Sequence, residues 1–270
     1  MPIRFTRTGI GTFPWRKPGI FTLDARSEAA CSTAWWTSAL GTSTVSRTLL
    51  SGSSSTWVAI EPLDQTVPKL RRASSLGVME LYVLARHGES TLNLENRING
   101  DFSVPVALTE KGREEAGFLG RQLAHVRIDV CVHTRFSRTR ETAEIALAGR
   151  NVPLEVEPLL DDIEVGDLEG ATIEDYRVWK REHERSDDFP GGESLDDAAR
   201  RYAVAYRKVL ERSESSILVV THEIPIRYAL NAAAGSDDLD GPAHQLANAT
   251  PYLFDQDALA RAVAGIERLT

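Results

Sequence analysis

The sequence predicts a three-layer α/β/α domain built around a mostly parallel central sheet. Between residue 79 and the end of the chain, short apolar runs alternate with segments of helical periodicity. This alternation is typical of a parallel sheet that helices cover on both faces. Two of the apolar runs also end directly at a histidine, at the position where ligands bind in such folds.

The expected elements follow from local patterns. The strands are short runs rich in β-branched and aliphatic residues. We expect strands over 80–85, 129–133, 154–157, 216–221 and 252–254. The helices place apolar side chains three and four residues apart, and Thr109 and Ser194 can cap two of them. We expect helices over 110–126, 138–148, 194–213, 225–234 and 259–269.

The overall composition excludes several classes of protein. The chain has 270 residues, 42% of them hydrophobic and 26% charged, with a net charge of −8. This composition is globular, and the negative charge argues against a nucleic-acid partner bound through a basic face. No apolar run reaches the roughly 18 residues that a membrane span needs. Two cysteines, Cys31 and Cys131, cannot form a disulfide framework, so we expect a reducing, cytoplasmic compartment.

Residues 1–78 differ from the rest of the chain. They carry nine Lys and Arg against four Asp and Glu, together with 22 Ser and Thr, and show no sustained periodicity. We expect a poorly structured extension over 1–78 and the catalytic domain over 79–270. Two origins for the extension stay open. It is an organelle transit peptide, or it is upstream sequence that precedes a true start at Met79 or Val78.

Charged side chains gather where the predicted strands end. Arg86 and His87 follow the first strand, Arg138 comes shortly after the second, and His222 follows the fourth. Because the carboxyl ends of parallel strands meet at one edge, we expect these side chains in one pocket. Paired arginines favour an anion such as phosphate. A neutral imidazole can attack phosphorus to form a phosphohistidine, and an acid within 161–170 could protonate the leaving group.

At these residues the chain resembles the histidine phosphatase superfamily, which includes the cofactor-dependent phosphoglycerate mutases. Five blocks in the family's order carry the resemblance: 86–100, 106–116, 134–143, 192–194 and 219–222. Several blocks in order are far more specific than one Arg-His-Gly triplet. The resemblance spans about residues 79–254, omits 1–78, and implies a phosphoglycerate mutase-like fold.

The resemblance also implies a role for each matching residue. His87 would accept the phosphoryl group, and Asp162, four residues before Gly166, would be the general acid. The residues that bind the phosphoryl group and the substrate would be Arg86, Arg138, a protonated His222, Asn93 and Gly100. An alternative for Asn93 is that it only caps a helix.

Two residues depart from the family pattern. Asp162 stands where the family usually has Glu and is one methylene shorter, so Glu164 stays open as the acid. Glu223 follows His222 where the family usually has Gly. Its carboxylate could keep His222 charged, or it could face solvent.

Three functions remain open on the sequence alone. The first is a phosphomonoester hydrolase that acts on a small phosphorylated metabolite through a phosphohistidine. The second is a phosphoglycerate mutase-type isomerase, and the third is a non-catalytic sensor of a phosphorylated ligand. The resemblance implies a longer, basic insertion in mutases, whereas the segment from Gly170 to Pro190 is short and acidic, which favours the hydrolase. We expect no metal, cofactor or membrane partner, and a homodimer stays open.

Overall fold

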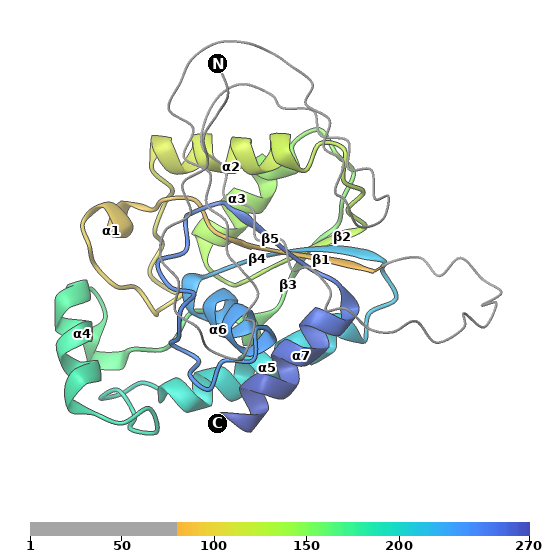
Figure 1. The fold of residues 1–270 in the computed structure, drawn as a ribbon. Helices are drawn as coiled ribbons and strands as arrows, with labels where there is room; N and C mark the ends of the chain where they lie inside the picture. Colours follow the sequence, from red (N-terminus) through yellow and green to blue (C-terminus); the bar gives the residue numbers. More distant parts are fainter. Residues whose placement is uncertain (1–79) are drawn as a thin grey trace, which may run out of the picture. The chain divides into compact units, whose positions relative to one another are not determined.

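A five-stranded sheet forms the centre of the computed structural model, which describes residues 80–270 (Figure 1). The expectations for residues 1–78 lie outside the described residues. The strand order is β3-β2-β4-β1-β5, and every neighbouring pair is parallel except β1 and β5. The strands are β1 (Leu81–Arg86), β2 (Val130–His133), β3 (Leu154–Val156), β4 (Ser216–Thr221) and β5 (Pro251–Phe254). The mostly parallel sheet predicted from the sequence is confirmed.

Helices cover both faces of this sheet. The α-helices are α1 (Thr91–Leu94), α2 (Glu110–Gln122), α3 (Ser137–Ala146), α4 (Ile173–Glu182), α5 (Leu195–Leu210), α6 (Glu223–Ala233) and α7 (Gln256–Arg268). Two short 3-10 turns, η1 (Pro158–Leu160) and η2 (Gly166–Leu168), lie between β3 and α4. Figure 1 shows α2 and α3 on one side of the sheet and α5, α6 and α7 on the other, which confirms the three-layer architecture.

The alternation of side chains along the strands explains the two cores. Along β4, Ile217 and Val219 pack into the cluster beneath α5–α7, while Leu218 and Val220 pack into the cluster beneath α2 and α3. All six residues of β4 are buried, because the strand lies between β2 and β1 and is covered on both faces. Strands of this kind appear in a sequence as continuous apolar runs, and the segment Ser216–Thr221 is such a run.

The structure differs from the sequence prediction mainly at helix ends and in two short helices. The first long helix ends at Gln122 rather than 126, and α6 begins at Glu223 rather than Pro225. Pro225 lies in the first turn of α6. Proline fits in a first turn because the N–H groups of that turn have no helical partners. Two helices, α1 and α4, were not predicted. Each starts with a capping box, in which Ser90 or Thr172 is the N-cap residue and exchanges hydrogen bonds with the residue three positions later.

The strand register brings the two histidines together. Arg86 pairs with Thr221 across β1 and β4, and the His87 N–H donates to the Thr221 carbonyl at 2.9 Å. His87 and His222 therefore leave neighbouring strands side by side.

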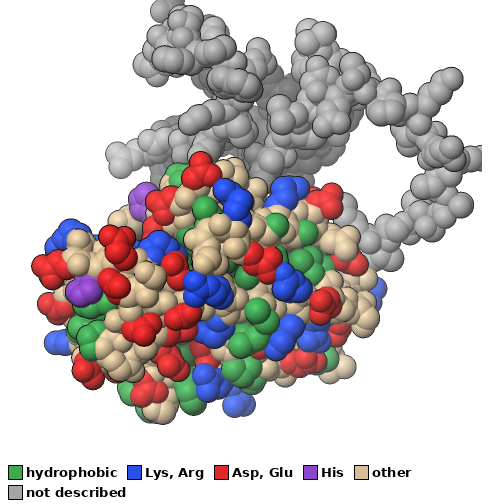
Figure 2. All heavy atoms as spheres, turned by 90° about the horizontal axis from the view of Figure 1, so that it is seen from below, with side chains coloured by type: hydrophobic (Ala, Val, Ile, Leu, Met, Phe, Trp, Pro, Cys, Tyr) green, Lys and Arg blue, Asp and Glu red, His purple; other side chains and the backbone are tan. Residues whose placement is uncertain are grey.

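The surface mixes charges of both signs. On the face that Figure 2 shows, acidic and basic side chains are interspersed over the described residues. Within residues 80–270, no helix is both long enough and apolar enough to cross a membrane.

Candidate active site

His87 is fixed in one tautomer by its own loop. The side chain is buried, and Nδ1 lies 2.7 Å from the Gly88 carbonyl oxygen. Because a carbonyl oxygen only accepts, Nδ1 carries the hydrogen, and the neutral ring keeps its lone pair on Nε2. Burial first, and then the charges of Arg138 and Arg86, lower the pKa of His87 well below 6.5. The ring is therefore neutral at pH 7 and presents a nucleophilic Nε2 to the site.

Arg138 connects the members of the site. It lies in the first turn of α3 and is 4% exposed. Its Nε donates to His87 Nε2 at 3.1 Å, and its Nη2 lies 3.1 Å from His222 Nδ1 and 3.3 Å from Asp162 Oδ2. Burial lowers the pKa of Arg138 to about 10, so the guanidinium stays charged at pH 7. The structure thus brings Arg138, which follows β2, together with His87 and His222, as the sequence analysis expects for one pocket.

A chain of hydroxyl groups orients His222. Its Nε2 lies 3.0 Å from Thr134 Oγ1, which lies 2.8 Å from Thr139 Oγ1. The Thr139 hydroxyl donates to the Phe136 carbonyl at 2.8 Å, so Thr139 accepts from Thr134, and Thr134 accepts from His222. Nε2 therefore carries hydrogen, and Nδ1 of the neutral ring accepts from Arg138.

The free site differs from the sequence expectation of a protonated His222. Burial and the neighbouring Arg138 charge lower the pKa of His222 well below 6.5. The ring is completely buried and packs edge-on against Phe136 and His87. A cationic imidazole in this position needs an additional negative charge beside Nδ1, which a bound phosphoryl group would supply.

Asp162 lies beside His222 and Arg138, and Glu164 does not. The Asp162 Oδ2 is 3.3 Å from His222 Nδ1, while Oδ1 accepts from the Ile163 N–H at 3.1 Å. Burial raises the pKa of Asp162, although the Arg138 charge opposes this effect. Glu164 is exposed, and it makes no side-chain contact with these residues in the described part of the chain. The geometry favours Asp162 as the proton donor.

Arg86 is held on one side of its guanidinium group. Its Nη1 donates to the Leu246 carbonyl at 2.7 Å and pairs with Glu223 Oε2 at 2.7 Å. The sequence left two roles open for Glu223, keeping His222 charged or facing solvent. Its carboxylate instead pairs with Arg86 and is 26% exposed. The buried Nε of Arg86 has no hydrogen-bond partner among the described residues.

Asn93 and Gly100 occupy different surroundings from the histidines. The Asn93 Oδ1 accepts from the Ser90 N–H at 3.1 Å and completes the cap of α1. Of the two roles that the sequence left open for Asn93, the structure shows the helix cap. Gly100 lines a pocket next to Asp162, and its N–H donates to Glu169 Oε2 at 2.7 Å. A Cβ at Gly100 would lie 2.1 Å from the Ile163 carbonyl oxygen, so no larger residue fits.

Sequence reasoning missed Asn99 and Glu169. The buried Asn99 accepts from Arg138 Nη1 through its side chain at 2.5 Å and from Nη2 through its carbonyl at 3.2 Å. Glu169 in turn accepts from Asn99 Nδ2 at 2.6 Å. These hydrogen bonds fix the orientation of the Arg138 guanidinium. The only signal for Asn99 was its place in the matching block 86–100.

A pocket of about 200 Å³ opens beside Asp162, and none of Arg86, His87, Arg138 and His222 is among its lining residues. Its lining carries acids and two arginines. Arg135 bonds Asp161 at 2.5 Å and stacks 3.6 Å above the Phe102 ring. Arg201 pairs with Glu193 and donates to the Leu159, Asp161 and Asp162 carbonyls. Arg201 is thus held by several acceptors, whereas Arg135 is paired through its Nε and its side chain is 36% exposed.

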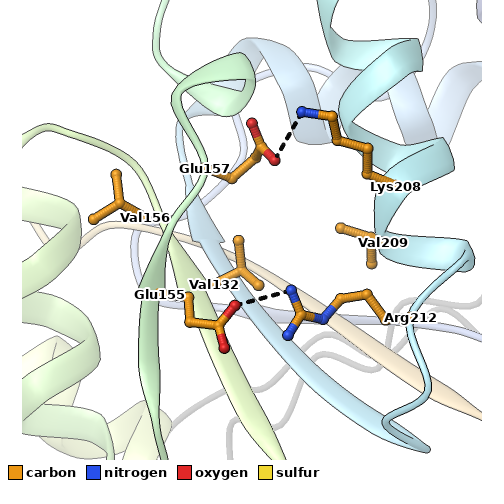
Figure 3. A pocket seen from close by; sticks show the side chains of 7 residues that line it. All are labelled: Val132, Glu155, Val156, Glu157, Lys208, Val209 and Arg212. Atoms are coloured by element: carbon orange, nitrogen blue, oxygen red, sulfur yellow. Dashed lines mark hydrogen bonds and ion pairs between the residues drawn. The ribbon is translucent and has the colours of Figure 1, made fainter.

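A second pocket, of about 120 Å³, lies between β3 and α5 (Figure 3). Two ion pairs bridge it, Glu155–Arg212 at 3.0 Å and Glu157–Lys208 at 3.4 Å. It holds none of the histidines and no nucleophile. Within residues 80–270, no three His, Cys, Asp or Glu side chains come together as a metal site.

Comparison with known proteins gives one family and several relatives. The model of the histidine phosphatase superfamily (branch 1) matches residues 82–265. The chain is 35% identical over 167 residues to 2,3-bisphosphoglycerate-dependent phosphoglycerate mutase 2 of Gloeobacter violaceus, which covers 56% of this chain and 74% of the relative.

Solved structures show the same fold. YhfR of Bacillus stearothermophilus has a TM-score of 0.56 and 28% identity, covering 64% of this chain and 89% of that one. The alpha-ribazole phosphatase of Shigella flexneri has a TM-score of 0.53 and 24% identity, covering 59% of this chain and 82% of that one. At that identity, the second structure shows the shared fold alone.

Proposed function

The chain belongs to the histidine phosphatase superfamily (branch 1), and on this premise we propose that it hydrolyses the phosphomonoester of a small metabolite through a phosphohistidine at His87. The superfamily is one of enzymes, and proteins similar to this chain include mutases and phosphatases. One observation carries the proposal. His87 Nδ1 is tied to the Gly88 carbonyl, so the unprotonated Nε2 accepts from Arg138, and the charges of Arg138 and Arg86 both act on the ring.

The proposed reaction has two displacements. First, His87 Nε2 bonds to phosphorus as the bond from phosphorus to the leaving oxygen breaks, and Asp162 gives its proton to that oxygen. Next, a water gives a proton to the Asp162 carboxylate and attacks phosphorus, and the bond from phosphorus to Nε2 breaks. Inorganic phosphate leaves, and His87 returns to its neutral state. Arg86 and Arg138 hold the non-bridging oxygens through both steps.

We propose that the pocket beside Asp162 holds the leaving group, and its charge then favours hydrolysis over the mutase reaction. A mutase must hold a phospho-acid that carries an additional carboxylate. The lining instead contains Asp161, Glu164 and Glu193, and its two arginines are already paired. An anionic leaving group would meet four carboxylates there, counting Asp162, against two arginines that already have acid partners, which disfavours its binding.

The three cations of α4 also lie beside acids. Lys180 pairs with Asp240 at 3.0 Å, while Arg181 and Arg177 share Glu174 at 3.1 and 3.7 Å. The helix therefore supplies little uncompensated positive charge, in agreement with the acidic segment seen in the sequence. A mutase remains the second candidate, because the 35% identical relative bears that name.

Two assays separate the candidates. In the first, the protein is incubated with p-nitrophenyl phosphate and a chelator, and phosphate release is measured. In the second, 3-phosphoglycerate is supplied with 2,3-bisphosphoglycerate, and formation of 2-phosphoglycerate is followed. We expect release in the first and no isomerisation in the second. Isomerisation would establish the mutase, and phosphate binding without either reaction would indicate a sensor. His87→Ala is the control for both assays.

A further inference from the structure

Glu223 places a carboxylate against an arginine of the phosphoryl site. It is the first residue of α6, directly after His222, and its Oε2 lies 2.7 Å from Arg86 Nη1. The two side chains are only 26% and 16% exposed. At that burial, the attraction between the charges is screened less than in a pair at the open surface.

The pair occupies one side of the Arg86 guanidinium and leaves another donor without a partner. The Leu246 carbonyl accepts from Nη1, and Glu223 Oε2 forms an ion pair with the same atom. The buried Nε has no acceptor within residues 80–270. Buried N–H groups are normally hydrogen-bonded, so this donor is suited to an oxygen of a bound ligand. Glu223 thus fixes the guanidinium while Nε stays available.

The Glu223 charge acts chiefly on Arg86. The other cation near it is Arg227, whose Nη1 is 3.7 Å from Glu223 Oε1. Arg227 already bonds Asp240 at 2.5 Å through Nη2. Arg86 is therefore balanced by Glu223, and a phosphate dianion meets less positive charge than two free arginines would give. The same carboxylate contributes to raising the pKa of Asp162.

We propose that Glu223 is a positioning residue that braces Arg86 and offsets its charge, so that inorganic phosphate is released quickly after hydrolysis. The inference rests on the proposed function, in which Arg86 holds the phosphoryl group. A site that holds inorganic phosphate weakly also holds other phosphorylated ligands weakly at the same arginine. Glu223 would then bias this site toward hydrolysis.

The test is phosphate binding by Glu223→Gln, which removes the charge and keeps an acceptor for Arg86. Isothermal calorimetry with inorganic phosphate at low salt should show binding about five to ten times tighter than wild type. The inhibition constant of phosphate against p-nitrophenyl phosphate hydrolysis should fall by the same factor. Glu155→Gln is the matched control, because it removes the charge from an Arg–Glu pair in the remote pocket of Figure 3. It should bind phosphate as wild type does.

Unchanged or weaker phosphate binding by folded Glu223→Gln overturns the inference. If that variant does not fold, Glu223→Ala decides: it should also bind phosphate more tightly, with a lower kcat because the brace is lost. The alkaline limb of the pH profile for alkyl phosphates should move to lower pH in Glu223→Gln, an effect that a purely structural role would not produce. Calorimetry needs no turnover, so a wild-type protein that binds phosphate and hydrolyses nothing would refute the proposed function alone.

Discussion

Asp162→Asn should separate substrates by their leaving groups. The asparagine keeps the shape of the side chain and can still bond the Ile163 N–H, as Asp162 does at 3.1 Å. It cannot deliver a proton to a leaving alkoxide. The positions of His87, Arg138 and His222 depend on other contacts, so the nucleophile and the phosphoryl cradle should remain in place.

The size of the effect follows from the chemistry of proton transfer. General acid catalysis typically contributes about 10²- to 10⁴-fold, or about 3–5 kcal/mol of transition-state stabilisation. An alkyl phosphate such as glycerol phosphate releases a strongly basic alkoxide and should lose activity by that factor. The p-nitrophenolate ion is a weak base and needs little protonation, so p-nitrophenyl phosphate should lose less than about tenfold.

The assay measures kcat for both substrates in wild type, Asp162→Asn and Glu164→Gln. Glu164 is the neighbouring acid that the sequence left open, and its side chain is exposed, so Glu164→Gln should retain near wild-type rates on both. Equal losses on the two substrates in Asp162→Asn would refute the assignment of the acid. A selective loss on alkyl phosphates in Glu164→Gln would transfer the role to Glu164.

Three further outcomes are expected. His87→Ala should abolish turnover and the acid-labile phosphoprotein that labelled substrate forms on wild type after rapid quenching; label retained in the variant would contradict the nucleophile. The pH profile of kcat/KM for alkyl phosphates should have an acid limb, at a pH below 6.5, where His87, whose pKa is lowered, gains a proton. It should also have an alkaline limb, at a pH above 3.8, where Asp162, whose pKa is raised, loses its proton. An alkaline limb of equal depth with aryl substrates would argue against Asp162 as its origin. Gly112→Ala should lower the thermal midpoint, because its Cβ would lie 2.0 Å from the Glu89 carbonyl oxygen and overpacking costs about 1–3 kcal/mol; an unchanged midpoint would show that the loop yields easily.

The sheet and the residues at its strand ends could be predicted because they depend on local patterns. A buried parallel strand needs a continuous apolar run, and the run ending at Thr221 gave β4 with its observed bounds. The convergence of His87 and His222 needed only the rule that parallel strands present their carboxyl ends at one edge. Arg138 required only a short connection from β2 into α3. The match to the family model confirms the resemblance carried by these blocks.

The supporting contacts could not be predicted because they join segments far apart in the chain. Glu169 reaches Asn99 across 70 residues, and no periodicity determines the path of the loops between them. The partner of Glu223 was missed for the same reason, since Arg86 ends β1, far earlier in the chain than α6. The state of His222 depends on burial and on Arg138, neither of which the sequence states directly.

The arrangement around Arg138 implies that phosphoryl transfer exchanges one hydrogen bond for another. Before a ligand binds, Nε donates to His87 Nε2, Nη1 to Asn99, and Nη2 lies near Asp162 and His222. When Nε2 bonds to phosphorus, its lone pair can no longer accept from Arg138. The Nε–H is then released toward the oxygens of the phosphoryl group, where negative charge develops in the transition state. The guanidinium need not move, because Asn99 and Glu169 hold its other side, so the stabilising donor is in place as the reaction proceeds.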